Sequence, residues 1–271
     1  MDMFPVTLIF GLFGLIIGSF LNVVILRLEQ GVTFGGRSMC PKCQALIRWY
    51  DNIPLVSFFV LRGRCRQCQT PISWQYPLVE FATGALFALF GTLSIGLATP
   101  PELVQTFWHL FLVSLLIAIT VTDVRNMEIP LILLLAGVGG AVFAAVAETT
   151  VSGIGFLEPG APWRMMLFGG GVAALLFYGL VYYSKETWMG MGDVWLAGIA
   201  GAAVGLPALL LLFTLSFFTG AVVGGALLLF GKKGMKSQIP FAPFLSVGTL
   251  STLLLLALKP WWLMLLLLPI V

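Results

Sequence analysis

Charged residues are scarce in this sequence. Only 9% of its 271 residues are Asp, Glu, Lys or Arg, whereas 59% are hydrophobic. A soluble domain carries more polar surface than this, so the composition excludes a soluble protein and predicts a polytopic membrane protein. We expect the chain to contact lipid and to bind no nucleic acid.

Histidine is nearly absent, because His109 is the single example. It precedes Asp123 by fourteen residues on the same predicted helix, which is about 21 Å at about 1.5 Å per residue. His109 therefore cannot share a proton directly with Asp123, and we interpret it as structural or interfacial. The sequence also lacks a Gly-rich dinucleotide-binding loop. We expect no cleavable signal peptide, since no basic residue precedes the first apolar run.

Eight apolar runs have about the length that a helix needs to cross a bilayer. We therefore predict an all-α polytopic integral membrane protein with about eight transmembrane helices. The sixth run is started at residue 187, because a helix from Val194 to Leu206 would be only about 20 Å long, too short for a bilayer core. The runs are residues 6–26, 77–98, 103–122, 129–147, 165–183, 187–206, 207–230 and 244–271.

The basic residues collect in alternate loops. With the loops placed on alternate sides, twelve of the fourteen Lys and Arg residues fall on one side, and only Arg164 and Lys259 fall on the other. The positive-inside rule puts the larger group in the cytoplasm and the N-terminus outside. Asp123 and Asp193 then both lie at the cytoplasmic face.

Asp193 ends the stretch Gly190-Met191-Gly192-Asp193 and directly precedes the uncharged run 194–230. An acid at a membrane edge is a functional candidate, and the glycines let the backbone bend and let another segment approach closely. Asp123 has a comparable setting at the end of the run 103–122. Two such carboxylates suggest a pair that shares a proton and activates water. Taken alone, the four-residue stretch fits a structural helix start equally well.

All four cysteines lie in the one large polar segment, as Cys40-Pro-Lys-Cys43 and Cys65-Arg-Gln-Cys68 with twenty-one residues between the pairs. Cytosolic thiols stay reduced, so disulfides are not expected. Two such pairs supply four thiolates for tetrahedral zinc, and no ligand position is left open. We predict a structural zinc that fixes the intervening loop, with redox chemistry as the alternative.

Four polar or small positions stand out in the first two runs. Gly14 and Gly18 have the spacing that permits close helix packing. Asn22 either hydrogen-bonds a neighbouring helix or lines a site near the cytoplasmic interface. Glu80 either forms a salt bridge with the polar segment or contacts a cationic substrate or cofactor amine.

Several ordered blocks resemble the bacterial type IV prepilin peptidases, the bifunctional leader peptidase and N-methyltransferase family of GxGD-type membrane proteases. Arg125 and Leu131 stand where the family often has a second acid and a polar residue, which leaves Asp123 as the catalytic acid of its block. Ala242 stands where the family usually has glycine. The blocks are residues 18–27, 49–57, 61–65, 71–80, 123–130, 190–193 and 239–248.

The resemblance implies an aspartyl endopeptidase of the bacterial inner membrane that removes the short basic leader of type IV prepilins or pseudopilins at the cytoplasmic face. It implies Asp123 and Asp193 as the catalytic pair. One would be ionised and act as general base on water, while the other, protonated, would polarise the scissile carbonyl. The pair titrates as a unit, so the sequence does not assign the two roles.

The resemblance also implies methylation of the newly exposed α-amine with S-adenosyl-L-methionine. Gly63, Asn52 and Glu80 are the candidate cofactor-binding residues. The corresponding division of the chain is a first transmembrane helix at 1–28, a zinc-binding methyltransferase part at 29–76, and a transmembrane aspartyl peptidase core at 77–271.

Two other classes of function remain open. One is a GxGD membrane peptidase without methyltransferase activity, against which the cysteine-bearing segment argues. The other is a non-enzymatic membrane scaffold or transporter. A scaffold needs no paired acids at one face, and a transporter favours acids near the midplane.

Overall fold

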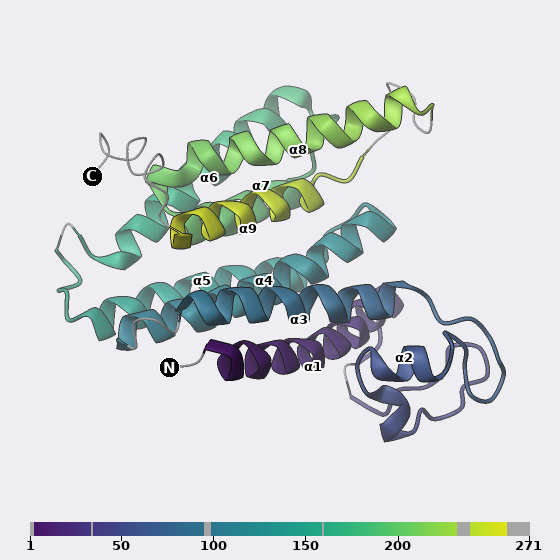
Figure 1. The fold of residues 1–271 in the computed structure, drawn as a ribbon. Helices are drawn as coiled ribbons and strands as arrows, with labels where there is room; N and C mark the ends of the chain where they lie inside the picture. Colours follow the sequence, from purple (N-terminus) through teal and green to yellow (C-terminus); the bar gives the residue numbers. More distant parts are fainter. Residues whose placement is uncertain (1–2, 34, 95–98, 159, 232–238, 259–271) are drawn as a thin grey trace. The chain divides into compact units, whose positions relative to one another are not determined.

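The computed structural model describes residues 3–33, 35–94, 99–158, 160–231 and 239–258. Within these ranges the chain is helical, and the only β-type pairing consists of two isolated bridges. In order, the helices are α1 Met3–Gln30, η1 Trp49–Asn52, α2 Val56–Val60, α3 Gln75–Ser94, α4 Pro100–Asn126, α5 Leu131–Ser152, α6 Pro162–Ser184, α7 Met191–Val204, η2 Leu206–Ala208, α8 Leu209–Leu229 and α9 Ala242–Leu258 (Figure 1).

The predicted all-α membrane architecture is confirmed. Six helices are long and apolar enough to cross a bilayer, and two shorter apolar helices, α7 and α9, accompany them. These eight helices correspond to the eight predicted runs. The ends of the second and eighth runs, at 95–98 and 259–271, and the basic loop at 232–236 lie outside the described residues.

The sixth helix starts later than predicted. α7 begins at Met191, not at residue 187, and its 14 residues give it a length of about 21 Å. The preceding Lys185 and Glu186 have positive φ angles of 50° and 60°, which interrupt the helix that ends at Ser184. Asp193 consequently lies in the first turn of α7, not two turns inside it.

The chain forms two compact units, Met1–Gly96 and Leu97–Val271. In the first unit α1 packs along α3, and two glycines make this possible. A Cβ atom at Gly14 would lie 2.6 Å from the Cβ of Phe87, and one at Gly18 would lie 2.7 Å from the Cα of Glu80. The packing role predicted for Gly14 and Gly18 is therefore confirmed.

In the second unit α7 lies at the centre of the packing, in contact with α5, α6, α8 and α9. Its side chains Leu196 and Ile199 are almost completely buried. α6 and α7 approach at backbone distance, because a Cβ atom at Gly201 would lie 2.5 Å from the carbonyl oxygen of Gly169. A short helix is thus enclosed by longer ones.

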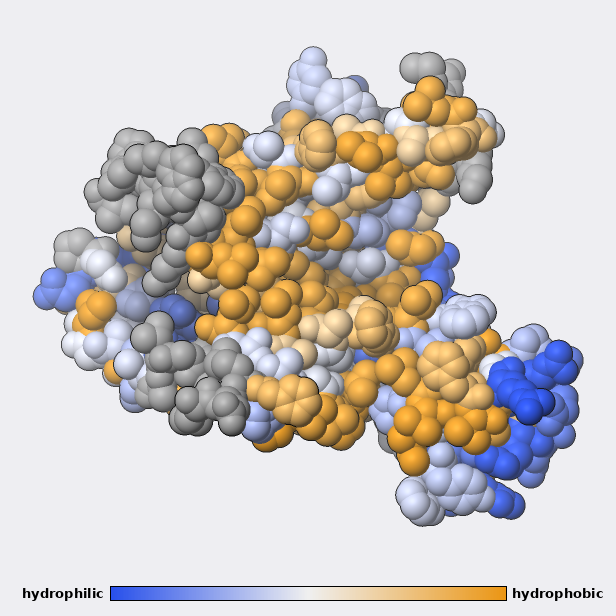
Figure 2. All heavy atoms as spheres, in the orientation of Figure 1, coloured by the Kyte–Doolittle hydropathy of each residue, from blue (hydrophilic) through white to orange (hydrophobic). Residues whose placement is uncertain are grey.

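The outward faces of the long helices are apolar. Phe143 on α5 is 75% exposed and Leu229 on α8 is 88% exposed. Figure 2 shows hydrophobic side chains over most of the visible helix surface. Such surfaces need lipid around them, so the protein is a multi-pass membrane protein.

Replacing Gly14 with leucine should destabilise the first unit by about 1–3 kcal/mol, because the new side chain collides with α3. Gly139→Leu on α5 is the matched control, since no heavy atom lies within 4 Å of a Cβ atom there. Thermal unfolding in detergent, followed by the helical circular dichroism signal, should show a lower midpoint for the Gly14 variant only. Equal midpoints for the two variants would contradict the close packing of α1 on α3.

Candidate functional site

Asp123 lies in the last turn of α4 and is only 6% exposed. Its Oδ2 atom accepts a hydrogen bond of 3.1 Å from the backbone N–H of Ala242. Ala242 is the first residue of α9, and residues 239–241 before it are not helical. This non-helical segment delivers a backbone donor to a buried carboxyl group.

A second polar contact fixes α4 against α9. The Thr120 hydroxyl donates to Ser246 Oγ at 3.1 Å. Thr120 precedes Asp123 by three residues and Ser246 follows Ala242 by four, so the two contacts occupy successive turns of antiparallel helices. The Asp123 side chain is therefore held in one register relative to α9.

Asp193 belongs to the first turn of α7, where its Oδ2 atom accepts a 3.2 Å hydrogen bond from the Gly190 N–H. Gly192 allows a close approach, because a Cβ atom there would lie 3.2 Å from the Ile129 side chain. Ile129 follows the end of α4, so this contact brings the start of α7 to the turn after Asp123. Asp193 lies within electrostatic reach of Asp123. Packing thus brings near each other two acids that are seventy residues apart in the chain.

The other candidates near this pair lie apart from it. Glu128, a third acid in this part of the chain, is exposed beside the Pro130 turn. Arg125, in the place of a possible second acid, is exposed as well. His109 lies on α4, fourteen residues before Asp123, as predicted.

A cavity of about 900 Å³ lies between α5, α6 and α7, and no pattern in the sequence predicted it. One end of it is lined by Met191, Val194 and Trp195, the immediate neighbours of Asp193. Its walls are otherwise almost wholly apolar. No periodic pattern distinguishes these residues from lipid-facing or core residues, so only the assembled bundle reveals them.

The four cysteines form one cluster. All are free thiols, as predicted, and their sulfur atoms lie within 4.8 Å of one another. The Sγ atoms of Cys40 and Cys68 are 3.8 Å apart. A tetrahedron with metal–sulfur bonds of about 2.3 Å has edges of about 3.8 Å. The donor set and its spacing, with Cys43 and Cys65 as the other members, therefore fit a tetrahedral thiolate metal site.

Both cysteine pairs form the same tight turn. Cys40 N–H donates to the Ala45 carbonyl at 3.0 Å, and Cys65 N–H donates to the Thr70 carbonyl at 2.9 Å. Hydrogen bonds from the Thr70 hydroxyl and backbone lower the pKa of the Cys68 thiol to about 6. A thiolate, the form that binds metal, is therefore favoured at this position.

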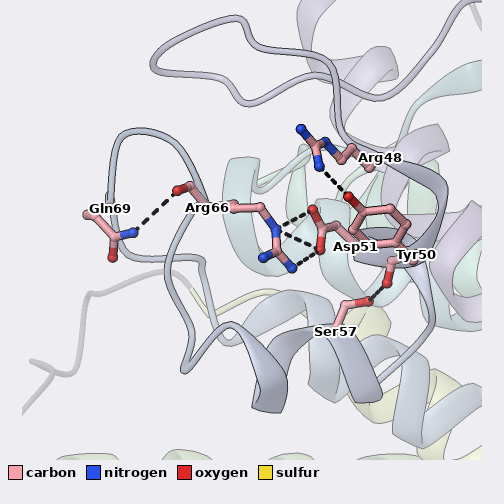
Figure 3. A network of polar contacts seen from close by, with 6 residues as sticks. All are labelled: Arg48, Tyr50, Asp51, Ser57, Arg66 and Gln69. Atoms are coloured by element: carbon pink, nitrogen blue, oxygen red, sulfur yellow. Dashed lines mark hydrogen bonds and ion pairs between the residues drawn. The ribbon is translucent and has the colours of Figure 1, made fainter.

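A polar network ties the segment between the pairs to the second pair (Figure 3). Arg66 donates from Nη2 to Asp51 Oδ1 at 2.6 Å and from Nε to Asp51 Oδ2 at 2.9 Å. These bonds and the charge of Arg66 hold the pKa of the Asp51 carboxyl below its usual range. The guanidinium groups of Arg48 and Arg66 both lie over the Tyr50 ring. The turn Trp49–Asn52 is therefore fixed beside Cys65.

Glu80 is buried, and its partners are neutral. Its Oε2 atom accepts a 2.8 Å hydrogen bond from the Leu55 N–H, and the Ser19 hydroxyl is a second partner. Of its two open interpretations, the salt bridge to the polar segment is therefore not observed. The carboxylate is instead hydrogen-bonded by the backbone N–H of Leu55, a residue with a positive φ angle of 59°.

The other two candidate cofactor residues lie on the same part of the segment. Asn52 ends η1 and is exposed. Gly63 has a φ angle of 65°, and its N–H donates to the Phe58 carbonyl at 2.8 Å. A Cβ atom at Gly63 would lie 3.2 Å from the Phe58 ring. The structure thus places Gly63 in a compact turn behind α2 and leaves the Asn52 amide available to a ligand.

Asn22 is almost fully buried and hydrogen-bonds the start of α3. Its Nδ2 atom donates to the Tyr76 carbonyl at 3.2 Å, and its Oδ1 atom accepts from Gln75 at 3.4 Å. Of its two open interpretations, the hydrogen bond to a neighbouring helix is the one observed.

Comparison with known proteins gives two family matches along this chain. Residues 12–93 match the Bacterial Peptidase A24 N-terminal domain, and residues 110–225 match the Type IV leader peptidase family. A prepilin leader peptidase/N-methyltransferase of Aeromonas hydrophila is 35% identical over 264 residues, which cover 88% of this chain and 86% of that protein. The chain belongs to the type IV leader peptidase family.

Other relatives of this leader peptidase carry the same name. The protein from Legionella pneumophila is 31% identical over 268 residues, which cover 90% of this chain and 89% of the relative. The protein from Myxococcus xanthus is 37% identical over 233 residues, which cover 83% of this chain but only 64% of the relative. No solved structure matches this leader peptidase.

Glu80→Ala should loosen the segment around α2, because the Leu55 N–H loses its acceptor, at a cost of about 1–3 kcal/mol. Glu80→Gln keeps a side-chain oxygen as acceptor and is the matched control. The rate of protease cleavage within residues 53–63 of the full chain should rise for the alanine variant and stay near the wild-type rate for the glutamine variant. Equal rates in all three proteins would show that Glu80 does not hold this segment.

Proposed function

We propose that this leader peptidase is a membrane aspartyl endopeptidase that removes the leader of type IV prepilins or pseudopilins and then N-methylates the new N-terminal residue. The relatives named for both activities support the proposal. The observation that carries it is the meeting of Asp123 and Asp193 at the junction of α4, α7 and α9.

In this proposal one carboxyl group of the pair is ionised and removes a proton from water, while the other is protonated and donates to the scissile carbonyl. Water attacks the carbonyl carbon, and the amide C–N bond breaks once the leaving nitrogen has been protonated. The Ala242 N–H keeps the Asp123 carboxyl group oriented. The two roles belong to the pair, which titrates as a unit.

The cavity beside Asp193 supports the choice of substrate. Its apolar lining between α5, α6 and α7 suits an apolar helix that follows a cleavage site. A short basic leader ahead of that helix complements the two carboxyl groups. Prepilins and pseudopilins combine these two features, as the resemblance to the family implies.

The proposed location is the bacterial inner membrane, with the N-terminus outside and the active sites at the cytoplasmic face. The excess of Lys and Arg in alternate loops supports this orientation. Both aspartates then meet the leader on the side where the preprotein is made.

We propose that Cys40, Cys43, Cys65 and Cys68 hold a structural zinc ion. Zinc would bind the four thiolates and staple a segment that has little core of its own. The matching turns of the two cysteine pairs and the 3.8 Å sulfur separation support this assignment.

For methyl transfer we propose the zinc-binding part at 29–76, with the peptidase core at 77–271 and the first transmembrane helix at 1–28. S-adenosyl-L-methionine would supply the methyl group. The exposed Asn52 amide can hydrogen-bond the polar groups of this cofactor, and Gly63 shapes the turn behind it. Glu80 would act by holding Leu55, and with it this turn, against α3.

Asp123→Asn and Asp193→Asn should each lower the rate of leader cleavage by about 10²–10⁴-fold, the contribution of a general acid or base. Glu128→Gln is the matched control, because this nearby acid is exposed and outside the pair. Cleavage of a purified prepilin should be unchanged in the control, and zinc content and helicity should be unchanged in all variants. Near-normal cleavage by either aspartate variant would remove that residue from the pair.

The two activities should separate by mutation. Asp193→Asn should still methylate a substrate whose leader has already been removed, since the methyl-transfer elements lie in residues 29–80. Gly63→Leu, at a position with positive φ, should lower methylation far more than cleavage. Methyl incorporation into a pre-cleaved pilin measures both. If a folded Asp193→Asn protein cannot methylate it, the two activities share one site.

Purified protein should contain one zinc ion per chain, with metal–sulfur distances of about 2.3 Å in X-ray absorption spectra. Replacing Cys43 or Cys68 with serine should remove the metal and open residues 29–76 to proteases, while the aspartate variants keep it. Elemental analysis without zinc, or a disulfide within either cysteine pair, would count against the assignment.

A further inference from the structure

The short helix α2 exposes an apolar face. Val56 is 54% exposed, Phe59 is 65% exposed and Val60 is 68% exposed. Figure 2 shows hydrophobic side chains gathered over α2 and hydrophilic ones along the outer edge of the same segment. A segment surrounded by water rarely carries such a face, so these side chains need a partner.

The depth of α2 follows from the bond between Leu55 and Glu80. Glu80 is five residues beyond the first residue of α3, about 7.5 Å along the helix axis. Gly18 of α1 packs at the same level, and it lies eight residues, about 12 Å, before Leu26 at the end of the first apolar run. Both helices are long and apolar enough to span a bilayer. Leu55, directly before α2, therefore lies deeper in the bilayer than the points at which α1 and α3 leave it.

The middle of α2 is level with the membrane edge. Phe58 packs against Trp74 with ring centroids 4.9 Å apart, and Trp74 directly precedes α3. Trp74 is itself 64% exposed. Tryptophan is enriched where a transmembrane helix meets the headgroup region. α2 thus lies between the level of Glu80 and the level of Trp74, in the part of one leaflet that is nearest the headgroups.

The residues that follow α2 are basic. Arg62, Arg64 and Arg66 are all exposed. Arg66 is already paired with Asp51. Arg62 and Arg64 can reach lipid phosphate groups while the apolar face of α2 contacts acyl chains. An amphipathic element with this arrangement is typical of an interfacial membrane anchor.

We infer that α2 is an interfacial anchor that inserts Val56, Phe59 and Val60 into the leaflet at which α3 begins. Its partner is the lipid surface. The zinc-binding segment would then lie on the membrane, where an amine freed at the end of a membrane helix would emerge. The insertion itself does not depend on either proposed activity.

Site-directed spin labelling of the full chain in phosphatidylethanolamine and phosphatidylglycerol vesicles tests the insertion. The label is placed at Phe59→Cys and, in a second protein, at Val60→Cys. Phe143→Cys on the lipid-facing side of α5 is the apolar control, and Thr33→Cys, exposed beyond the end of α1, is the aqueous control. The unsubstituted protein, treated with the label, measures any reaction at the four metal-site cysteines, and zinc content shows that each variant is folded.

Labels at positions 59 and 60 should be more accessible to oxygen than to a water-soluble nickel complex, as at position 143, and position 33 should show the reverse. Preferential access of nickel at positions 59 and 60 would overturn the inference, because α2 would then face water. Protection from both reagents would also overturn it, because protein, and not lipid, would cover the face. Neither outcome would bear on leader cleavage or methylation.

Discussion

A carboxyl group among apolar helices must obtain its hydrogen-bond donors from the protein, because lipid offers none. In this chain the donors are backbone amides at the starts of helices. The first residue of α9 donates to Asp123, and the residue before α2 donates to Glu80. The residue before α7 donates to Asp193. The first amides of a helix have no partner within it, so each helix start and its acid satisfy one another.

This constraint accounts for the shape of the proposed peptidase site. Asp193 can bond the Gly190 amide only if the helix begins directly after Gly190, which makes α7 short. Glycines at the contact between α6 and α7 then allow the longer helices to surround α7. The result brings the ends of α4 and α7 together, with an apolar cavity that starts beside Asp193. The proposed water-activating pair of carboxyl groups and the apolar helix of the proposed substrate thus have adjacent places.

Hydropathy was sufficient to predict the helical segments, and the spacing of the cysteines was sufficient to predict their cluster. Both signals are local or short in range. The start of α7 was predicted wrongly, because the length rule for a spanning helix was applied to a helix that longer neighbours enclose. Neither open interpretation of Glu80 included its observed partner, since charge pairing favours a cation and no sequence pattern identifies a backbone amide as the donor to this carboxyl group. The approach of Asp193 to Asp123 depends on packing between segments seventy residues apart, which the sequence indicates only through the placement of both acids at one membrane face and through family resemblance.

The proposed function requires one chain that first cuts its substrate and then methylates it. Mass spectrometry of a purified prepilin incubated with the purified protein, with and without S-adenosyl-L-methionine, follows both steps. We expect loss of the leader in both reactions, and an added mass of one methyl group on the shortened product only when the methyl donor is present. An intact leader in both reactions, or a shortened product that never gains the methyl group, would contradict it.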